Sequence, residues 1–80
     1  MSSILKLIEK IQNQPTNVNY NDIKKILEYF GYELKSVRGS HHKFAKGDET
    51  IIIPYHKPIK EIYVTKILNR IKGDKQWKKI

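Results

Sequence analysis

The spacing of apolar residues changes at Gly31, and that change determines which fold class the chain can adopt. Ahead of Gly31 the apolar residues recur every three or four positions, as on one face of a helix: Ile23, Ile26, Leu27 and Phe30. Beyond it, Tyr32 and Leu34 alternate with polar residues, as in a strand with one face in water. Both patterns in one chain predict an α+β fold.

Capping and turn residues divide the 80 residues into elements of a single domain. The predicted elements are helices over 3–12 and from Asn19 to Gly31, strands from Tyr32, over 40–45 and over 50–53, and a last helix ending near Gly73. We therefore predict a small three-stranded antiparallel sheet with helices on one face, together with an additional N-terminal helix. The expected parts are the additional helix and a linker (1–18), the core (19–73) and a basic tail (74–80).

One large apolar residue is enough to orient the strand over 40–45, because successive strand residues point to opposite faces of a sheet. Phe44 is the only large apolar side chain in this segment, and we expect it to face the helices. His42 then shares the buried face, whereas His41 and Lys43 point to the open face.

The next strand is expected to leave an isoleucine on the same open face. Ile51 and Ile53 must lie on one side of this strand and Ile52 on the other. If Ile51 and Ile53 belong to the core, Ile52 lies exposed beside His41. A single exposed isoleucine is common, but next to a basic face it indicates a surface that a partner covers at times.

The net charge of +8 predicts a polyanionic partner. Residues 35–46 carry four basic side chains and no acidic one, and residues 66–80 carry six against Asp74 alone. The alternative for the C-terminal group is a solvated end that keeps the protein in solution. Charge alone leaves a nucleic acid, an anionic membrane surface and an acidic protein open as partners.

The compartment is predicted from what the chain lacks. Without cysteine it can form neither disulfides nor thiolate metal sites. No run approaches the ~20 apolar residues that a bilayer span needs. Lys6, Glu9 and Lys10 interrupt the apolar residues near the N-terminus, unlike the core of a signal peptide. We expect a cytoplasmic protein that does not enter a membrane.

His41 is the side chain best suited to proton transfer, because an imidazole titrates near neutral pH. RNA brings its own nucleophile, the 2′-hydroxyl, and needs a base to activate it and cations to stabilise the transition state. Arg38, Lys43 and Lys46 could supply those cations. The alternative is that a lone histidine on a strand is structural or incidental.

Other chemistries fit the sequence less well. Ser40 and His41 are neighbours on a strand and point apart, so they cannot form a nucleophile–base pair. The three histidines lack a carboxylate at ligand spacing, which predicts no metal site. No glycine-rich loop that cradles phosphate is present, and we expect no cofactor. The first two helices could form a DNA-reading helix-turn-helix, but their expected exposed faces are not notably basic.

The segment Arg38-Gly39-Ser40-His41-His42-Lys43-Phe44 resembles the HicA toxins. The resemblance runs from about Tyr20 to Ile71 and depends on the order of its segments more than on Gly-Ser-His alone. These segments are the helix ending at Gly31-Tyr32, the Gly-Ser-His strand, Ile53-Pro54-Tyr55-His56, Lys57-Pro58-Ile59-Lys60 and the helix around Tyr63-Val64-Thr65.

The resemblance implies a fold like that of double-stranded-RNA-binding domains and an mRNA endonuclease activity that needs no ribosome. The catalytic histidine of the family directly follows Gly-Ser, which here is His41. Arg38, Ser40, Lys43 and Lys46 would contact RNA. His42 would be a packing residue.

The family also implies a partner, because in type II toxin–antitoxin systems a HicB antitoxin covers the active face of the toxin. Ile52 would suit such a cover. For His56 we expect a hydrogen bond that stabilises a turn, and no catalytic role. The chain departs from typical members in its additional helix, which could be a packing extension, a dimer contact or part of an antitoxin interface, so homo-oligomers stay open.

Three hypotheses follow from the sequence. The first is a toxin that cleaves mRNA without metal, with His41 as general base. The second is a non-catalytic RNA-binding module of the same fold, in which His41 and the lysines only contact phosphate. The third is an interaction protein whose basic surface binds an acidic partner.

Overall fold

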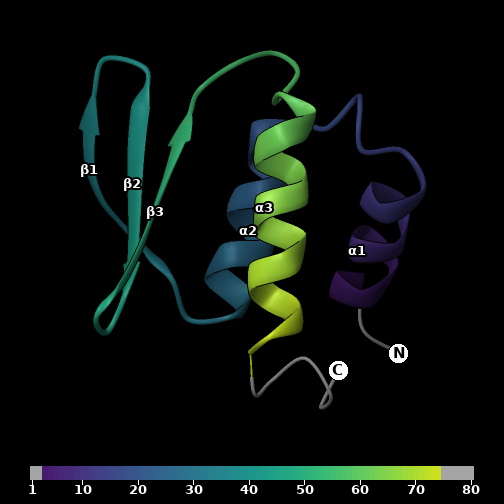
Figure 1. Cartoon of the computed structure of the whole chain (residues 1–80), viewed down its shortest axis with the longest axis horizontal. Coiled ribbons are helices and arrows are strands. Elements are labelled where there is room, and N and C mark those ends of the chain that lie inside the picture. Colours follow the sequence, from purple (N-terminus) through teal and green to yellow (C-terminus); the bar gives the residue numbers. More distant parts are fainter. Residues whose placement is uncertain (1–2, 75–80) are drawn as a thin grey trace.

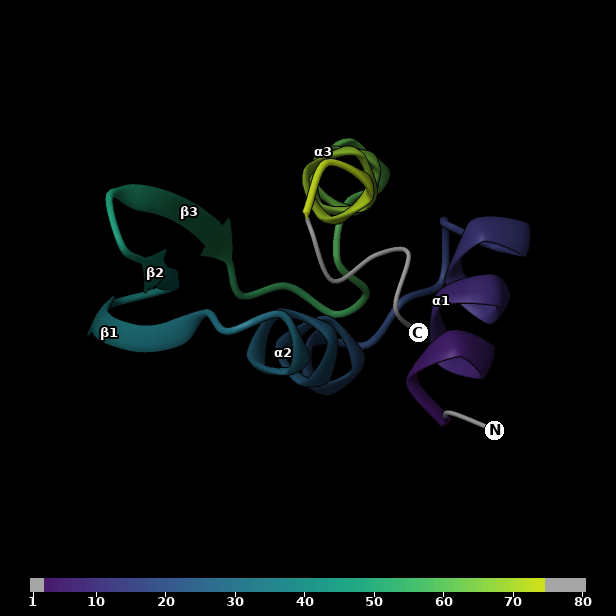
Figure 2. The ribbon, with the colours of Figure 1, turned by 90° about the horizontal axis from the view of Figure 1, so that it is seen from below.

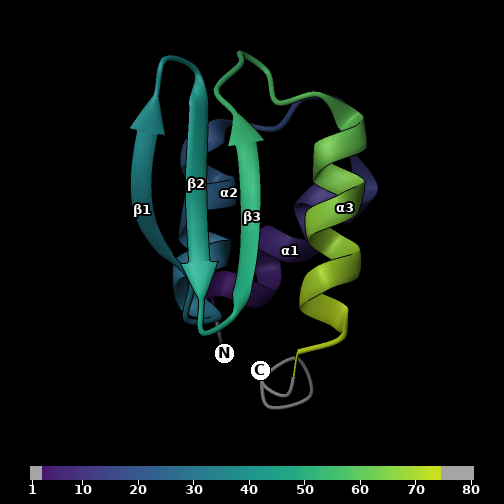
Figure 3. The same cartoon turned by 60° about the vertical axis from the view of Figure 1, so that its left-hand side comes forward.

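The structure is a computed structural model that describes residues 3–74. Its elements are α1 (Ser3–Asn13), α2 (Tyr20–Tyr29), β1 (Glu33–Arg38), β2 (His41–Lys46), β3 (Glu49–Pro54) and α3 (Glu61–Lys72). The strands form one antiparallel sheet in the order β1-β2-β3 (Figure 3). The predicted α+β class and the order of its elements are confirmed. The basic tail expected over 74–80 lies outside the described residues, except for Asp74.

The elements are arranged in three layers (Figures 1 and 2). The sheet forms one outer layer, α2 and α3 form the middle layer, and α1 lies beyond them on the side away from the sheet. One face of the sheet therefore packs on helices while the other is open. None of the helices in the described range is long and apolar enough to cross a membrane.

The change of period at Gly31 corresponds to the end of α2. Gly31 has a φ of +94°, a conformation that costs glycine little. Its N–H donates to the carbonyl of Glu28 and the N–H of Tyr32 donates to the carbonyl of Leu27, which is the hydrogen-bond pattern of a Schellman motif. This motif ends the helix and turns the chain into β1.

The face predictions for the sheet are confirmed. Phe44, Ile51 and Ile53 face the helices and are buried, whereas Ile52 points away with 46% of its surface exposed. The core that they join also takes in the four predicted residues of the last helix: Val64, Ile67, Leu68 and Ile71.

The additional helix α1 packs within this same core. Ile8 and Ile11 are 0% and 2% exposed, and α1 contacts both α2 and α3. Within the chain, α1 is thus a packing extension, the first of the three roles that the sequence left open. Since a domain of this size can bury only a small core, these two side chains are a substantial addition.

We predict that Ile8→Ala lowers the free energy of unfolding by about 2–5 kcal/mol, because it removes a fully buried side chain and leaves a cavity. Lys6→Ala, on the exposed face of the same helix, should change it by less than about 0.5 kcal/mol. Urea unfolding followed by circular dichroism measures both. An Ile8→Ala midpoint equal to that of wild type would mean that α1 is not part of the cooperative core.

Candidate functional site

A shallow hollow lies on the open face of the sheet. Because paired residues of neighbouring strands point to the same face, β2 brings His41 and Lys43 together with residues of both other strands. Arg38 is paired with His41, and Ser36 and Ile52 are paired with Lys43 from either side. These five side chains line the hollow, whose volume is about 320 Å³.

A β-bulge in β1 determines which side chains reach this hollow. The register shifts between Leu34 and Ser36, so that Lys35 is an extra residue on β1. Without the shift, strict alternation from the core-facing Leu34 would turn Ser36 and Arg38 toward the helices. With it, both point to the open face. Ser36 is not among the residues predicted from the sequence, because alternation alone gives no sign of a bulge.

The hollow is electropositive. Its lining contains the cations of Arg38 and Lys43 and the imidazole of His41, and no carboxylate. Within residues 3–74 neither Arg38 nor Lys43 forms an ion pair. Both charges are therefore free to attract an anion such as a phosphate group.

His42 points to the opposite side of β2 and is held there by aromatic contacts. Its Nδ1 is hydrogen-bonded to the hydroxyl of Tyr20 over 2.5 Å, and its ring stacks on that of Tyr55 with centroids 5.5 Å apart. Burial, followed by the charge of Glu28, raises the pKa of Tyr20 above its ordinary value, so the hydroxyl stays protonated at neutral pH. The predicted packing role of His42 is confirmed.

Ser40 lies in a turn and not in the strand that the sequence predicted over 40–45. Arg38 and His41 already pair with each other, which leaves Gly39 and Ser40 as a two-residue loop. Gly39 has a φ of +58°, as the first position of a type II′ hairpin turn requires. The carbonyl of Ser40 accepts a hydrogen bond from the N–H of Tyr55. Ser40 thus lies next to the hollow, at the end of the hairpin.

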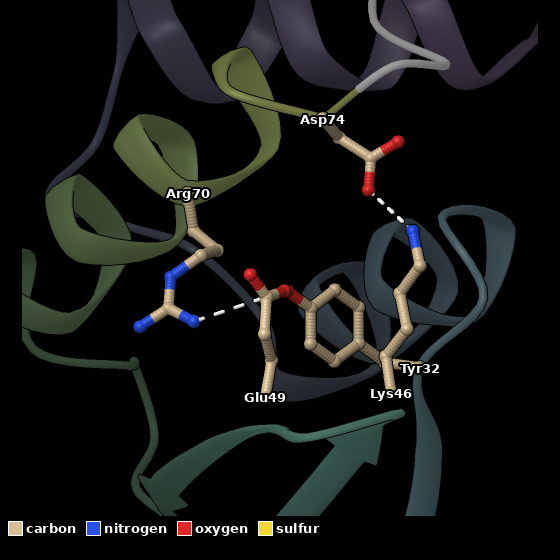
Figure 4. A network of polar contacts seen from close by, with 5 residues as sticks. All are labelled: Tyr32, Lys46, Glu49, Arg70 and Asp74. Carbon is tan, nitrogen blue, oxygen red and sulfur yellow. Dashed lines mark hydrogen bonds and ion pairs between the residues drawn. The ribbon is translucent and has the colours of Figure 1, made fainter.

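Lys46 is not brought to the hollow. It lies at the other end of β2, roughly 17 Å along the strand from His41, and on the side that faces the helices. Its ammonium group is 2.5 Å from the carboxylate of Asp74 (Figure 4) and 5.7 Å from the centroid of the Tyr32 ring. A role of Lys46 in binding RNA stays a prediction, and this position does not favour it.

The same end of the sheet contains further polar contacts (Figure 4). The hydroxyl of Tyr32 donates to the carboxylate of Glu49 over 2.8 Å, and Arg70 of α3 lies 4.0 Å from that carboxylate. Burial, followed by the hydrogen bond to Glu49, raises the pKa of Tyr32. The hydroxyl is therefore protonated at neutral pH and can donate.

His56 lies in the loop after β3 and stabilises it. Its Nδ1 is 2.8 Å from the carbonyl oxygen of Pro58, which can only accept, so Nδ1 carries the proton. The predicted turn-stabilising hydrogen bond is confirmed. No group of three or more His, Cys, Asp or Glu side chains is arranged to hold a metal ion in the described part of the chain.

Comparison with known proteins identifies a family. A family model described as "HicA toxin of bacterial toxin-antitoxin" matches residues 20–72. The match begins at the first residue of α2 and ends at the last residue of α3, so it includes the whole sheet and leaves out α1. No curated protein and no solved structure matches the chain.

We predict opposite effects on stability for the two adjacent histidines. His42→Ala should lower the free energy of unfolding by about 1–3 kcal/mol, because it removes the contacts with Tyr20 and Tyr55 and leaves a hydroxyl without its partner. His41→Ala should change it by less than about 0.5 kcal/mol, since His41 is exposed. Urea unfolding of both variants is the measurement, and equal losses would contradict the assignment of faces.

Proposed function

The chain belongs to the HicA toxin family, and from this premise we propose that it is an endoribonuclease that cleaves mRNA with His41 as general base. The observation that carries the proposal is the exposed imidazole of His41 beside two cations that have no ion-pair partner within residues 3–74. An anion drawn into the hollow by Arg38 and Lys43 would lie next to the group that can move a proton.

The proposed reaction uses the nucleophile of the substrate. His41 takes the proton of a ribose 2′-hydroxyl, and the 2′ oxygen attacks the adjacent phosphorus. The bond from phosphorus to the 5′ oxygen then breaks, and that oxygen takes up a proton from the imidazolium or from water. Arg38 and Lys43 stabilise the negative charge that builds up on the phosphoryl oxygens in the transition state. The products are a 2′,3′-cyclic phosphate and a 5′-hydroxyl.

A non-catalytic RNA-binding module remains the second candidate. In that case His41, Arg38 and Lys43 contact phosphate and no bond breaks. The same cations favour both candidates, so binding of RNA does not separate them and cleavage does.

We predict that His41→Ala abolishes cleavage of a long RNA, because no other imidazole lines the hollow. His56→Ala is the matched control and should still cut the RNA, since that ring does not line the hollow. The assay separates fluorescently labelled RNA on a denaturing gel.

Wild-type cleavage should continue in EDTA and leave 2′,3′-cyclic phosphate or 3′-phosphate ends, because the base and the cations are side chains. Ends with a 3′-hydroxyl, or activity that only magnesium restores, would point to a different mechanism. A His41→Ala variant that cuts at the normal rate would refute the general base, and a wild-type protein that binds RNA without cutting it would favour the second candidate.

We further propose that a HicB-type antitoxin covers the open face of the sheet. The family is the toxin of a bacterial toxin–antitoxin system. Ile52 offers an apolar contact in the lining of the electropositive hollow, with 46% of its surface exposed. A cover over Ile52 would also enclose His41 and exclude RNA.

We predict that Ile52→Lys weakens antitoxin binding by about tenfold or more, because an apolar contact becomes a desolvated charge. RNA binding should change by less than about twofold, since the added charge is positive. Ile62→Lys is the matched control, on α3 and 72% exposed. Both ligands are titrated against each variant by calorimetry. An antitoxin affinity unchanged by Ile52→Lys would mean that the cover lies elsewhere, and equal losses for both ligands would indicate a damaged fold.

A further inference from the structure

A second hollow, here called the Tyr55 pocket, lies where α2 begins and the chain leaves β3. Its volume is about 480 Å³, and it is lined by two tyrosines, two lysines, two asparagines and one aspartate. Neither the proposed catalysis nor the proposed antitoxin contact uses it. The start of α2, the turn between β1 and β2 and the end of β3 all lie at one end of the molecule, at the top of Figure 1.

The ring of Tyr55 is both exposed and fixed. Its exposed fraction is 40%. His42 stacks on it at an interplanar angle of 28°, and the ring of Tyr20 lies 4.9 Å away between centroids. Its backbone N–H is bonded to the carbonyl of Ser40. A ring packed against other rings yet partly exposed offers a rigid surface on which a nucleobase can stack at low entropic cost.

The charge around this ring suits a nucleotide. Lys57 extends over Tyr55 with its Nζ 6.0 Å from the ring centroid, and Lys25 lines the pocket from α2 against the single carboxylate of Asp22. The side chains of Asn19 and Asn21 offer amide donors and acceptors for a base edge. Aromatic stacking combined with cations that neutralise phosphate is how proteins hold single-stranded nucleic acid.

The pocket is also within reach of the first hollow. Pro54, which directly precedes Tyr55, is paired with His41 across β2 and β3, and paired Cα atoms lie about 5 Å apart. The two-residue turn Gly39-Ser40 lies at this same end of the sheet, and the space beside Gly39 is open. A single strand that crosses this turn would pass Ser40, one of the residues predicted to contact RNA.

We infer that the Tyr55 pocket binds a base of the single-stranded RNA substrate, stacked on Tyr55, in the nucleotide next to the one held at His41. This inference rests on the proposed function, since it takes RNA as the substrate. In this arrangement Tyr55 holds the base of the neighbouring nucleotide, and Lys57 contacts a phosphate group.

The test measures binding apart from cleavage. The probe is a fluorescently labelled 2′-O-methyl RNA single strand, which cannot be cut because its nucleophile is blocked, and fluorescence anisotropy gives the Kd. Tyr55→Leu, which keeps apolar packing without a π face, should weaken binding by roughly 5- to 100-fold. Tyr55→Phe keeps the ring and should stay within about twofold of wild type. Thermal unfolding of both variants checks that the fold is intact.

The phosphate contact has its own readout. Lys57→Gln should reduce the slope of log Kd against log salt concentration by about 0.7, the value for one phosphate contact on a single strand. Lys10→Gln, on the exposed side of α1 in the layer away from the sheet, is the matched control and should leave the slope unchanged.

The outcomes separate this inference from the proposed function. If wild type cuts long RNA and folded Tyr55→Leu binds the probe as wild type does, the pocket assignment fails and the ribonuclease stands. If wild type binds the probe but cuts nothing, and Tyr55→Leu loses binding, the pocket stands and the ribonuclease fails. If the wild-type protein does not bind the probe, the assignment of RNA binding to the Tyr55 pocket is wrong. The assignment is also wrong if Tyr55→Leu weakens binding of the antitoxin and leaves binding of the probe unchanged.

Discussion

Burial of the Phe44 side chain sets the register of the whole sheet. Phe44 is fully buried, and its partners across the sheet are Leu34 and Ile51. A slip of β2 by one residue would expose this ring and turn the charge of Lys43 toward the core, at a cost of several kcal/mol. The open position of His41 is therefore enforced by a contact on the other side of the sheet, which requires nothing from His41 itself.

The two ends of the sheet are stabilised by different chemistry. At the β2–β3 turn, ion pairs connect the hairpin to α3 and to the segment just beyond it, through Glu49 and Arg70 and through Lys46 and Asp74 (Figure 4). At the opposite end the contacts are aromatic and centre on His42. The lysine and arginine side chains that line the two hollows form no ion pairs among the described residues, so their charges remain available for an anionic ligand.

The sequence predicts most of the fold because alternation and helical spacing are local signals. Burial of Phe44 predicts the orientation of β2 and therefore the faces of His41 and His42. Burial of the other isoleucines of β3 predicts that Ile52 lies on the open face. What the sequence could not give depends on contacts between distant residues or on a local irregularity. The bulge at Lys35 inverts the faces of Ser36 and Arg38, and the two-residue hairpin moves Ser40 out of its predicted strand. The ion pair of Lys46 joins residues 28 positions apart, and no periodicity reveals it.

The layered arrangement separates stability from the site. α1 adds Ile8 and Ile11 to the core from the side away from the sheet, outside the region that the family model matches. It enlarges a small core without covering the open face, where side chains such as His41 bury little and stabilise little. The residues that line the open-face hollow can therefore change at small cost in stability, whereas His42, one position along the same strand from His41, cannot. Adjacent histidines on a strand thus have different surroundings, and His41 is accessible for the proposed catalysis while His42 packs, because the sheet has one packed face and one open face.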